Sequence, residues 1–201
     1  MTMRKISIIV FILLSIINAE AQNNTGRRPD LQDAYDRVIN DKSTESWINF
    51  FDIFPSTFEK FDSIFGYREN QKGPLYDMYQ QYIYLFFEAQ KHIKGDVYYD
   101  KLIKIAKDGI WDADANSLFQ LCIVNFVIND STNHQKNSFL ETLSTFSETD
   151  ISNFWRFYFE DLYPDCYGEK YKKTFSSLQG YERLLLIMEK RYKTICKDYN
   201  R

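Results

Sequence analysis

The stretch PLYDMYQQYIYLFFEAQKH, residues 74–92, decides the fold class. Its apolar side chains recur every three or four residues, at positions 75, 78, 79, 82, 83, 86 and 87. This spacing follows the 3.6-residue turn of an α-helix and not the two-residue alternation of a strand. Pro74 suits the first turn of a helix, because its missing N–H would have no partner there. The stretch therefore predicts a helix from Pro74 to about residue 92 with a wide apolar face.

The same helical period extends in both directions, from Leu31 to about Tyr199. The chain of 201 residues contains only 7 glycines and 4 prolines, which argues against an all-β sandwich with its many turns. The run from Leu118 to Ile128 is the most apolar, so we expect it to form the most buried helix. The loops between the helical stretches are short, which favours antiparallel neighbours. We therefore expect residues 30–201 to form a single compact all-α domain of about nine helices.

Polar residues mark where several of these helices begin and end. Ser56 and Glu59 have the spacing of a capping box, in which the hydroxyl accepts from a free N–H and the carboxylate reaches back. Gly66 is expected to end the helix that this box opens. The sequence from Ser147 to Asp150 predicts a further helix start of the same kind.

The N-terminus has the three parts of an export signal in order. Two basic residues precede the apolar run Ile6–Ile17, and Ala19 and Ala21 then form an A-x-A cleavage site. The run is shorter than the ~20 residues that a membrane span needs. We therefore expect residues 1–21 to be a cleaved signal peptide and residues 22–29 a disordered leader. The mature protein would lie in the periplasm or be secreted, without a stable membrane anchor.

Charge is distributed unevenly along the chain. Without residues 1–21, the chain has 23 basic and 27 acidic residues, and this net charge of −4 argues against nucleic-acid binding. Residues 30–65 carry a net charge of −5 and residues 168–201 a net charge of +5. Two interpretations follow. The acidic segment, with Asp33 and Asp36 facing solvent, docks a basic partner, or the two segments attract one another within the molecule.

Three cysteines leave an odd number in an exported chain. Cys166 follows Pro164 in a predicted loop, and Cys196 lies in the last predicted helix. An oxidising compartment allows these two to form a disulfide, and two separate thiols are the alternative. Cys122 lies in the most apolar run, so we expect it to be buried and inert.

No combination of residues predicts a catalytic, cofactor-binding or metal site. Residues 112–116 (DADAN) have the first ligand spacings of a calcium loop, but the glycine and the final glutamate of that loop are missing. Helix capping by Asp114 or Asn116 is the simpler explanation. The two histidines, His92 and His134, lack further zinc ligands at supporting spacing, and there is no G-x-S-x-G, glycine-rich phosphate loop or C-x-x-C. We therefore expect a protein that is not an enzyme.

The aromatic content points to a protein interface as well as to a core. The chain has 17 phenylalanines, whose helical spacing predicts a core, and 15 tyrosines, more than a small core needs. Tyr67 and Tyr76 lie in or beside a polar loop that also carries Arg68. Tyrosine and arginine are enriched in protein interfaces. The candidate partner-binding residues are therefore Tyr67, Arg68 and Tyr76, together with Asp33 and Asp36.

The segment Phe50–Tyr67, followed by Gly73–Tyr76 and Tyr82–Phe87, resembles small exported all-helical proteins of Bacteroidetes. Some of these proteins are associated with immunity to type VI secretion effectors. The resemblance rests mainly on Phe, Pro and Gly packing signals, and it implies a helical fold and export without catalytic residues. We therefore expect a periplasmic protein-binding protein, with the concrete form of an immunity protein that occludes an antibacterial effector. The alternatives are an envelope accessory protein that binds a resident partner, and an enzyme without a recognisable motif.

Overall fold

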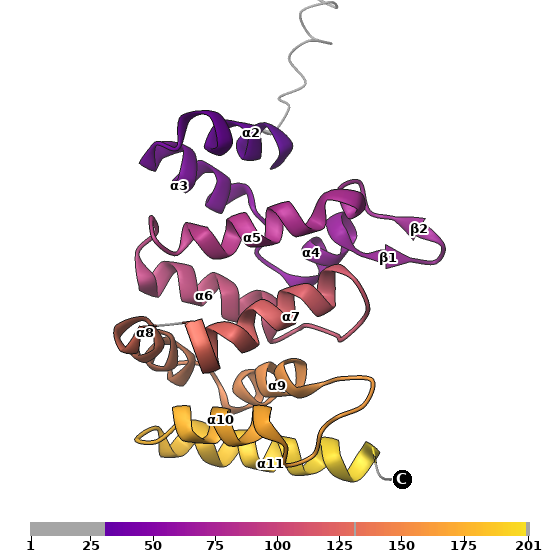
Figure 1. Ribbon diagram of the computed structural model, residues 1–201, viewed down its shortest axis with the longest axis vertical. Coiled ribbons are helices and arrows are strands. Elements are labelled where there is room, and N and C mark those ends of the chain that lie inside the picture. Colours follow the sequence, from indigo (N-terminus) through magenta and orange to yellow (C-terminus); the bar gives the residue numbers. More distant parts are fainter. Residues whose placement is uncertain (1–30, 131, 200–201) are drawn as a thin grey trace, which may run out of the picture.

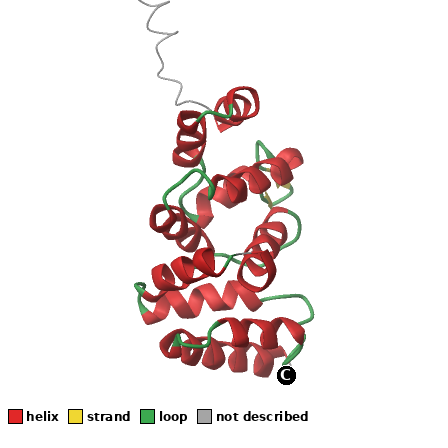
Figure 2. Cartoon of the chain, turned by 60° about the vertical axis from the view of Figure 1, so that its left-hand side comes forward, coloured by secondary structure: helices red, strands yellow, loops and turns green. Residues whose placement is uncertain are grey.

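The computed structural model describes residues 31–130 and 132–199, which are almost entirely helical (Figures 1 and 2). The ten α-helices of this part of the chain are α2 (Leu31–Asp41), α3 (Thr44–Ile53), α4 (Phe58–Phe65), α5 (Tyr79–Ala89), α6 (Gly95–Ala106), α7 (Ala115–Asn125), α8 (Asn133–Ser144), α9 (Glu148–Phe159), α10 (Glu169–Ser177) and α11 (Glu182–Tyr199). The all-α prediction is confirmed, with ten helices where about nine were expected.

Three short elements complete the described chain. The 3-10 helix η1 (Tyr76–Met78) precedes α5, and the π-helix η2 (Phe126–Asp130) follows α7. Strands β1 (Tyr67–Arg68) and β2 (Gln71–Lys72) form one antiparallel hairpin. None of the helices in the described ranges is long and apolar enough to cross a membrane. The predicted signal peptide and leader, residues 1–21 and 22–29, lie outside these ranges.

The helices succeed one another along the long axis of the molecule in the order of the sequence (Figure 1). Helices α2 and α3 form one end, and α10 and α11 form the other. The most extensive packing joins α9 with α11, α6 with α8, and α2 with α3. Each helix buries its apolar face against such neighbours, so the helices at the two ends keep an outer face that no other helix covers.

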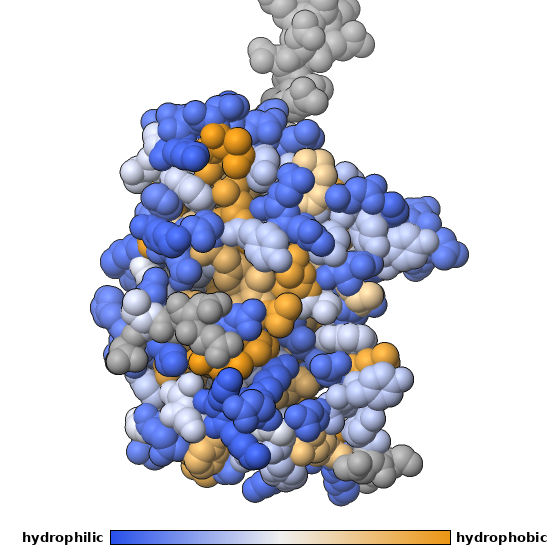
Figure 3. Space-filling view, viewed as in Figure 1, coloured by the Kyte–Doolittle hydropathy of each residue, from blue (hydrophilic) through white to orange (hydrophobic). Residues whose placement is uncertain are grey.

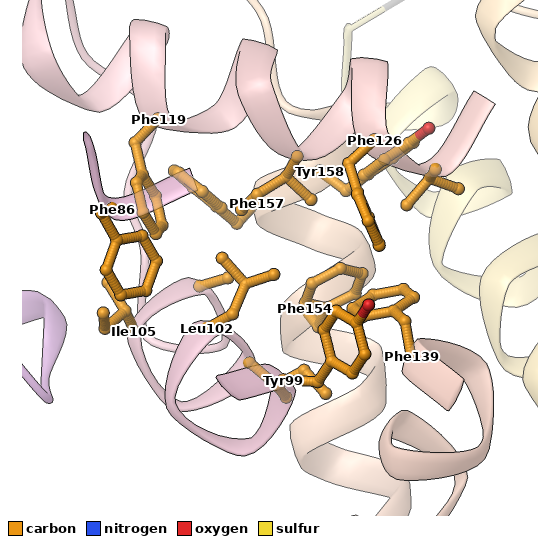
Figure 4. Close-up of a cluster of buried hydrophobic side chains, with 14 of the residues drawn as sticks. Phe86, Tyr99, Leu102, Ile105, Phe119, Phe126, Phe139, Phe154, Phe157 and Tyr158 are labelled. Carbon is orange, nitrogen blue, oxygen red and sulfur yellow. The ribbon is translucent and has the colours of Figure 1, made fainter. Parts of the chain in front are cut away.

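Phenylalanines connect the layers of this stack, as their spacing predicts. Figure 4 shows Phe86 of α5, Phe119 of α7 and Phe157 of α9 close together, and Phe139 of α8 beside Phe154 of α9. All five side chains are completely buried. The rings of Phe86 and Phe119 lie 6.1 Å apart, and those of Phe139 and Phe154 lie 5.8 Å apart. Aromatic contacts at these distances stabilise the fold beyond the area that they bury.

We expected the run through α7 to form the most buried helix, but one face of this helix is partly exposed. Phe119 and Ile123 are completely buried, but Leu121 keeps 51% of its surface exposed. Cys122, expected to be buried, is only half-buried. The two polar residues of the run, Gln120 and Asn125, do not mark the outer face, because Gln120 is itself buried.

Two helix starts differ from the capping predictions and one agrees with them. Helix α4 begins one residue later than the box at Ser56 predicts, because the Thr57 hydroxyl caps it by accepting from the N–H of Lys60 at 3.3 Å. Helix α5 begins at Tyr79 and not at Pro74. The start of α9 is confirmed, since the Ser147 hydroxyl accepts from the N–H of Asp150.

A disulfide fastens the loop after α9 to the last helix. Cys166 and Cys196 are bonded, with their Cα atoms 5.8 Å apart and a sequence separation of 30. The hydroxyl of Tyr192, one turn before Cys196, donates to the carbonyl of Asp165 at 2.8 Å. The same hydroxyl accepts from the N–H of Tyr167 at 2.7 Å. The loop is therefore held to α11 by one covalent bond and two hydrogen bonds.

A lysine is buried where α6 meets the C-terminal end of α3. Lys101 has only 8% of its surface exposed, and its ammonium group donates to the carbonyls of Phe51 and Asp52. These carbonyls belong to the last turn of α3, which has no N–H of its own to offer them. Burial lowers the pKa of Lys101 from 10.5 to about 8, although the Asp52 carboxylate acts in the opposite direction. The free-energy cost of burying the ammonium charge therefore exceeds the stabilisation that its neighbours provide.

This buried lysine predicts a stability that rises with pH above pH 8. Between pH 8 and about 10 the unfolded chain keeps a proton on residue 101 that the folded protein has lost, so the free energy of unfolding increases. Burial also lowers the pKa of Lys170 to about 8, so replacing Lys101 by methionine should make this rise shallower without abolishing it. Lys104→Met, an exposed change on the same helix, should leave the rise unchanged. Urea unfolding as a function of pH measures the effect. An equally steep rise in the Lys101→Met protein would contradict this assignment.

Candidate protein-binding surfaces

A short hairpin projects from the side of the stack between α4 and η1 (Figure 1). Tyr67 pairs with Lys72 and Arg68 with Gln71. Glu69 and Asn70, at the tip, have φ angles of 49° and 64°. Positive φ at both central residues is the mark of the tight turn whose twist matches that of the strands. The sequence predicted only a polar loop here, because two-residue strands show no alternation and glutamate rarely adopts this conformation.

The base of the hairpin is closed tightly against α4. The N–H of Gly73 donates to the carbonyl of Gly66 at 2.9 Å, and the N–H of Leu75 donates to the carbonyl of Ile64 at 3.0 Å. A Cβ atom on Gly73 would lie 2.3 Å from the Ile64 carbonyl oxygen, so a larger residue does not fit. Pro74 follows this contact and leads into η1, which explains why the helix starts later than the sequence predicts.

A buried carboxylate anchors the first strand. Asp62 of α4 has 4% of its side chain exposed, and it forms an ion pair with Arg68. It also accepts a hydrogen bond of 3.0 Å from the side-chain amide of Asn116 on α7. Burying a carboxylate is costly unless it is paired and hydrogen-bonded, so these contacts fix the strand relative to two helices. The Arg68 side chain is still 60% exposed and can contact a partner.

Aromatic rings cover one side of the hairpin. The ring of Tyr67 lies 5.8 Å from that of Tyr76, and the Lys72 ammonium lies 4.9 Å from the Tyr76 ring centre. The Tyr76 hydroxyl donates to the carboxylate of Asp114, which raises the pKa of Tyr76 to about 12 because the negative carboxylate favours the protonated phenol. Tyr67 keeps 47% of its surface exposed. A partner would therefore meet an aromatic surface that is already held in place.

The structure brings together three of the five predicted partner-binding residues. Tyr67 and Arg68 lie on the hairpin, and Tyr76 of η1 packs against Tyr67. Asp33 and Asp36 lie apart from them on α2, at the end of the stack (Figure 1). Both aspartates are exposed, as their position off the apolar stripe predicts.

Sequence reasoning missed the residues that hold the hairpin. Asp114 or Asn116 was expected to cap a helix, but neither side chain caps α7. Asp114 instead accepts from Tyr76 of η1, beside the hairpin, and Asn116 donates to Asp62. The position of Asp62 in the sequence could have predicted that its carboxylate is buried and paired. It falls at i+4 from Phe58, within the apolar face of α4, and a carboxylate at such a position needs a partner.

The acidic and basic segments do not neutralise each other within the molecule. Helix α2 lies at one end of the stack and α11 at the other (Figures 1 and 2). The bases of α11 instead contact neighbouring helices. Arg183 donates to the carbonyls of Ser144 and Phe146, and Arg191 donates to the Ser152 hydroxyl. The interpretation that the two segments attract one another is therefore wrong.

The two histidines have ordinary surroundings. The ring of His92 stacks on that of Trp47 with their centres 4.4 Å apart, and His134 is exposed on α8. Within residues 31–130 and 132–199, no group of three or more His, Cys, Asp or Glu side chains could hold a metal ion.

The chain matches no protein family model, no curated protein and no solved structure.

Proposed function

We propose that this protein is a periplasmic, non-enzymatic binding protein that acts as an immunity protein by occluding an antibacterial effector. The observation that carries the proposal is the projecting hairpin with Tyr67 and Arg68 exposed on it. A projecting, anchored hairpin suits insertion into a concave surface such as an effector's active-site cleft. Residues 50–87 resemble small exported helical proteins of Bacteroidetes, and the association of some of these with type VI immunity supports the same function.

The hairpin is suited to this role because its conformation is fixed before a partner arrives. The ion pair to Asp62, the tight turn and the contact at Gly73 leave little freedom to lose on binding. Affinity gained in this way comes from avoided ordering costs as much as from new contacts. Tyrosine adds a large contact area at a small cost in side-chain entropy.

The acidic end of the stack favours a basic effector. Asp33 and Asp36 are exposed on α2 and are not neutralised by the basic C-terminal helix. Exposed charges of this kind act mainly on the rate of association, and salt screens them. The end surface would steer the effector, and the hairpin would hold it.

Replacing Tyr67 by alanine should therefore weaken effector binding by about tenfold or more, mainly through faster dissociation. The fold should survive, because Tyr67 is 47% exposed. The binding kinetics are measured with an effector captured from effector-producing cells. Survival of cells whose periplasm receives that effector gives the functional readout.

A matched control lies in the loop after α9, outside the hairpin. Tyr163 is 72% exposed, so Tyr163→Ala removes the same side chain from a surface outside the hairpin, and it should leave binding unchanged. Equal losses from both variants, or none from Tyr67→Ala, would refute the hairpin as the contact surface.

A further inference from the structure

We infer that a groove between α9 and α11 binds the α2–α3 end of a second copy of this chain, so that the protein associates head to tail. The groove consists of two adjoining hollows, of about 480 and 400 Å³, that share Glu148, Ile187 and Lys190 in their walls. Together they extend along α11 from Arg183 to Thr194.

The groove combines an apolar strip with basic walls. Leu186 is 66% exposed beside the nearly buried Ile187. Arg183, Lys190 and Arg191 line it against a single acid, Glu148. Lys190 lies 4.0 Å from that acid, but both side chains are largely exposed, so the pair is weak. The groove therefore offers exposed apolar surface beside basic side chains. Figure 3 shows hydrophilic and hydrophobic residues side by side on one face of this end of the molecule.

The opposite end of the molecule has complementary chemistry. Helix α2 carries Asp33, Asp36 and Asp41 with one base, Arg37. Ile39 of α2 and Ile48 of α3 are 48% and 45% exposed, so apolar groups lie among the acids. Helix α2 has 11 residues, about 16 Å of helix, and the stretch of α11 that lines the groove has nearly the same length. The outer face of α2, acidic with Ile39 exposed among the acids, is therefore complementary to the groove in charge and similar to it in length.

A contact of this kind does not close on itself. The groove and the α2–α3 end are different surfaces at opposite ends of one molecule, so each contact leaves one groove and one α2–α3 end free. Such heterologous contacts add further copies instead of stopping at a dimer, unless the chain of copies closes into a ring.

Sedimentation velocity of the purified protein over a wide concentration range tests the inference. At about 0.01 M salt, species beyond the dimer should grow with concentration, and they should dissociate at about 1 M, where the Debye length falls from roughly 30 to 3 Å. Two double variants, Asp33→Lys/Asp36→Lys and Leu186→Glu/Lys190→Glu, should each weaken association by about tenfold or more. All four positions are exposed, so both proteins should fold. Mixing the two variants should restore association only as far as a one-to-one pair, because the intact groove of one then meets the intact α2–α3 end of the other.

The control is a charge reversal on the same helix outside the groove. Lys193→Glu/Lys197→Glu alters two exposed lysines of α11 that do not line the hollows, and it should change association less than about threefold. A wild-type protein that stays monomeric at low salt would overturn the inference. Association that is weakened neither by the α2 double variant nor by the groove double variant would also overturn it. The test needs no other protein, so its outcome is independent of the proposed function.

Discussion

Replacing Phe86 by alanine is expected to lower the free energy of unfolding by about 3–5 kcal/mol. Phe86 is completely buried, and its ring lies 4.3 Å from that of Phe54, 5.2 Å from that of Tyr98 and 6.1 Å from that of Phe119. These partners come from three other parts of the chain, so the side chain is a shared contact of several layers. Its removal would leave a cavity that neighbours with their own contacts cannot fill.

Equilibrium unfolding in urea measures this loss, and α5 supplies the control. Tyr84 lies two residues before Phe86 and is 54% exposed, so Tyr84→Ala should change the free energy of unfolding by no more than about 0.5 kcal/mol. Similar values for the two variants would show that the aromatic cluster does not hold the stack together.

Removing the disulfide with Cys166→Ala/Cys196→Ala should cost about 3–4 kcal/mol. The bond closes a loop of 30 residues, and it restricts the unfolded chain more than the folded one. Cys196 is nearly buried in α11, whose packing against α9 is the most extensive in the molecule. The loss should therefore fall on the C-terminal layer first, where hydrogen exchange of α11 would detect it.

Reduction separates the effect of the bond from that of the substitutions. A reducing agent should lower the stability of the wild-type protein by a similar amount and leave the double alanine variant unchanged. Cys122 is outside the disulfide, so Cys122→Ala should retain the full response to the reducing agent. Wild-type stability that is independent of the reducing agent would contradict a structural disulfide.

The two proposals share the acidic helix α2 and otherwise involve different surfaces. The hairpin projects from the side of the stack, whereas the groove and the acidic helix lie at its two ends. A basic effector steered to α2 would approach the surface that we infer to contact a second copy. Effector binding and self-association would then compete, and adding effector should shift the protein towards single copies.

The residues of the sequence determined the helices and the core. The three-to-four-residue spacing of Phe and Tyr predicts helical faces because a helix must bury one side, and those faces are the ones that pack. The cap at Ser147 followed from local chemistry in the same way, since an N-cap hydroxyl bonds within its own turn. These features depend on neighbours within about four residues, so the sequence alone is sufficient to predict them.

Only the tertiary structure decided which polar and apolar groups meet. Asp62, Arg68 and Asn116 lie in separate segments, and only the packing of α4 against α7 brings them to one hairpin. The exposure of Leu121 likewise depends on which side of α7 the rest of the chain covers. The separation of the acidic and basic ends depends on the order of stacking, because net charges along a sequence carry no distances. The helices were therefore local properties of the sequence, whereas the candidate binding surfaces required contacts between residues far apart in the chain.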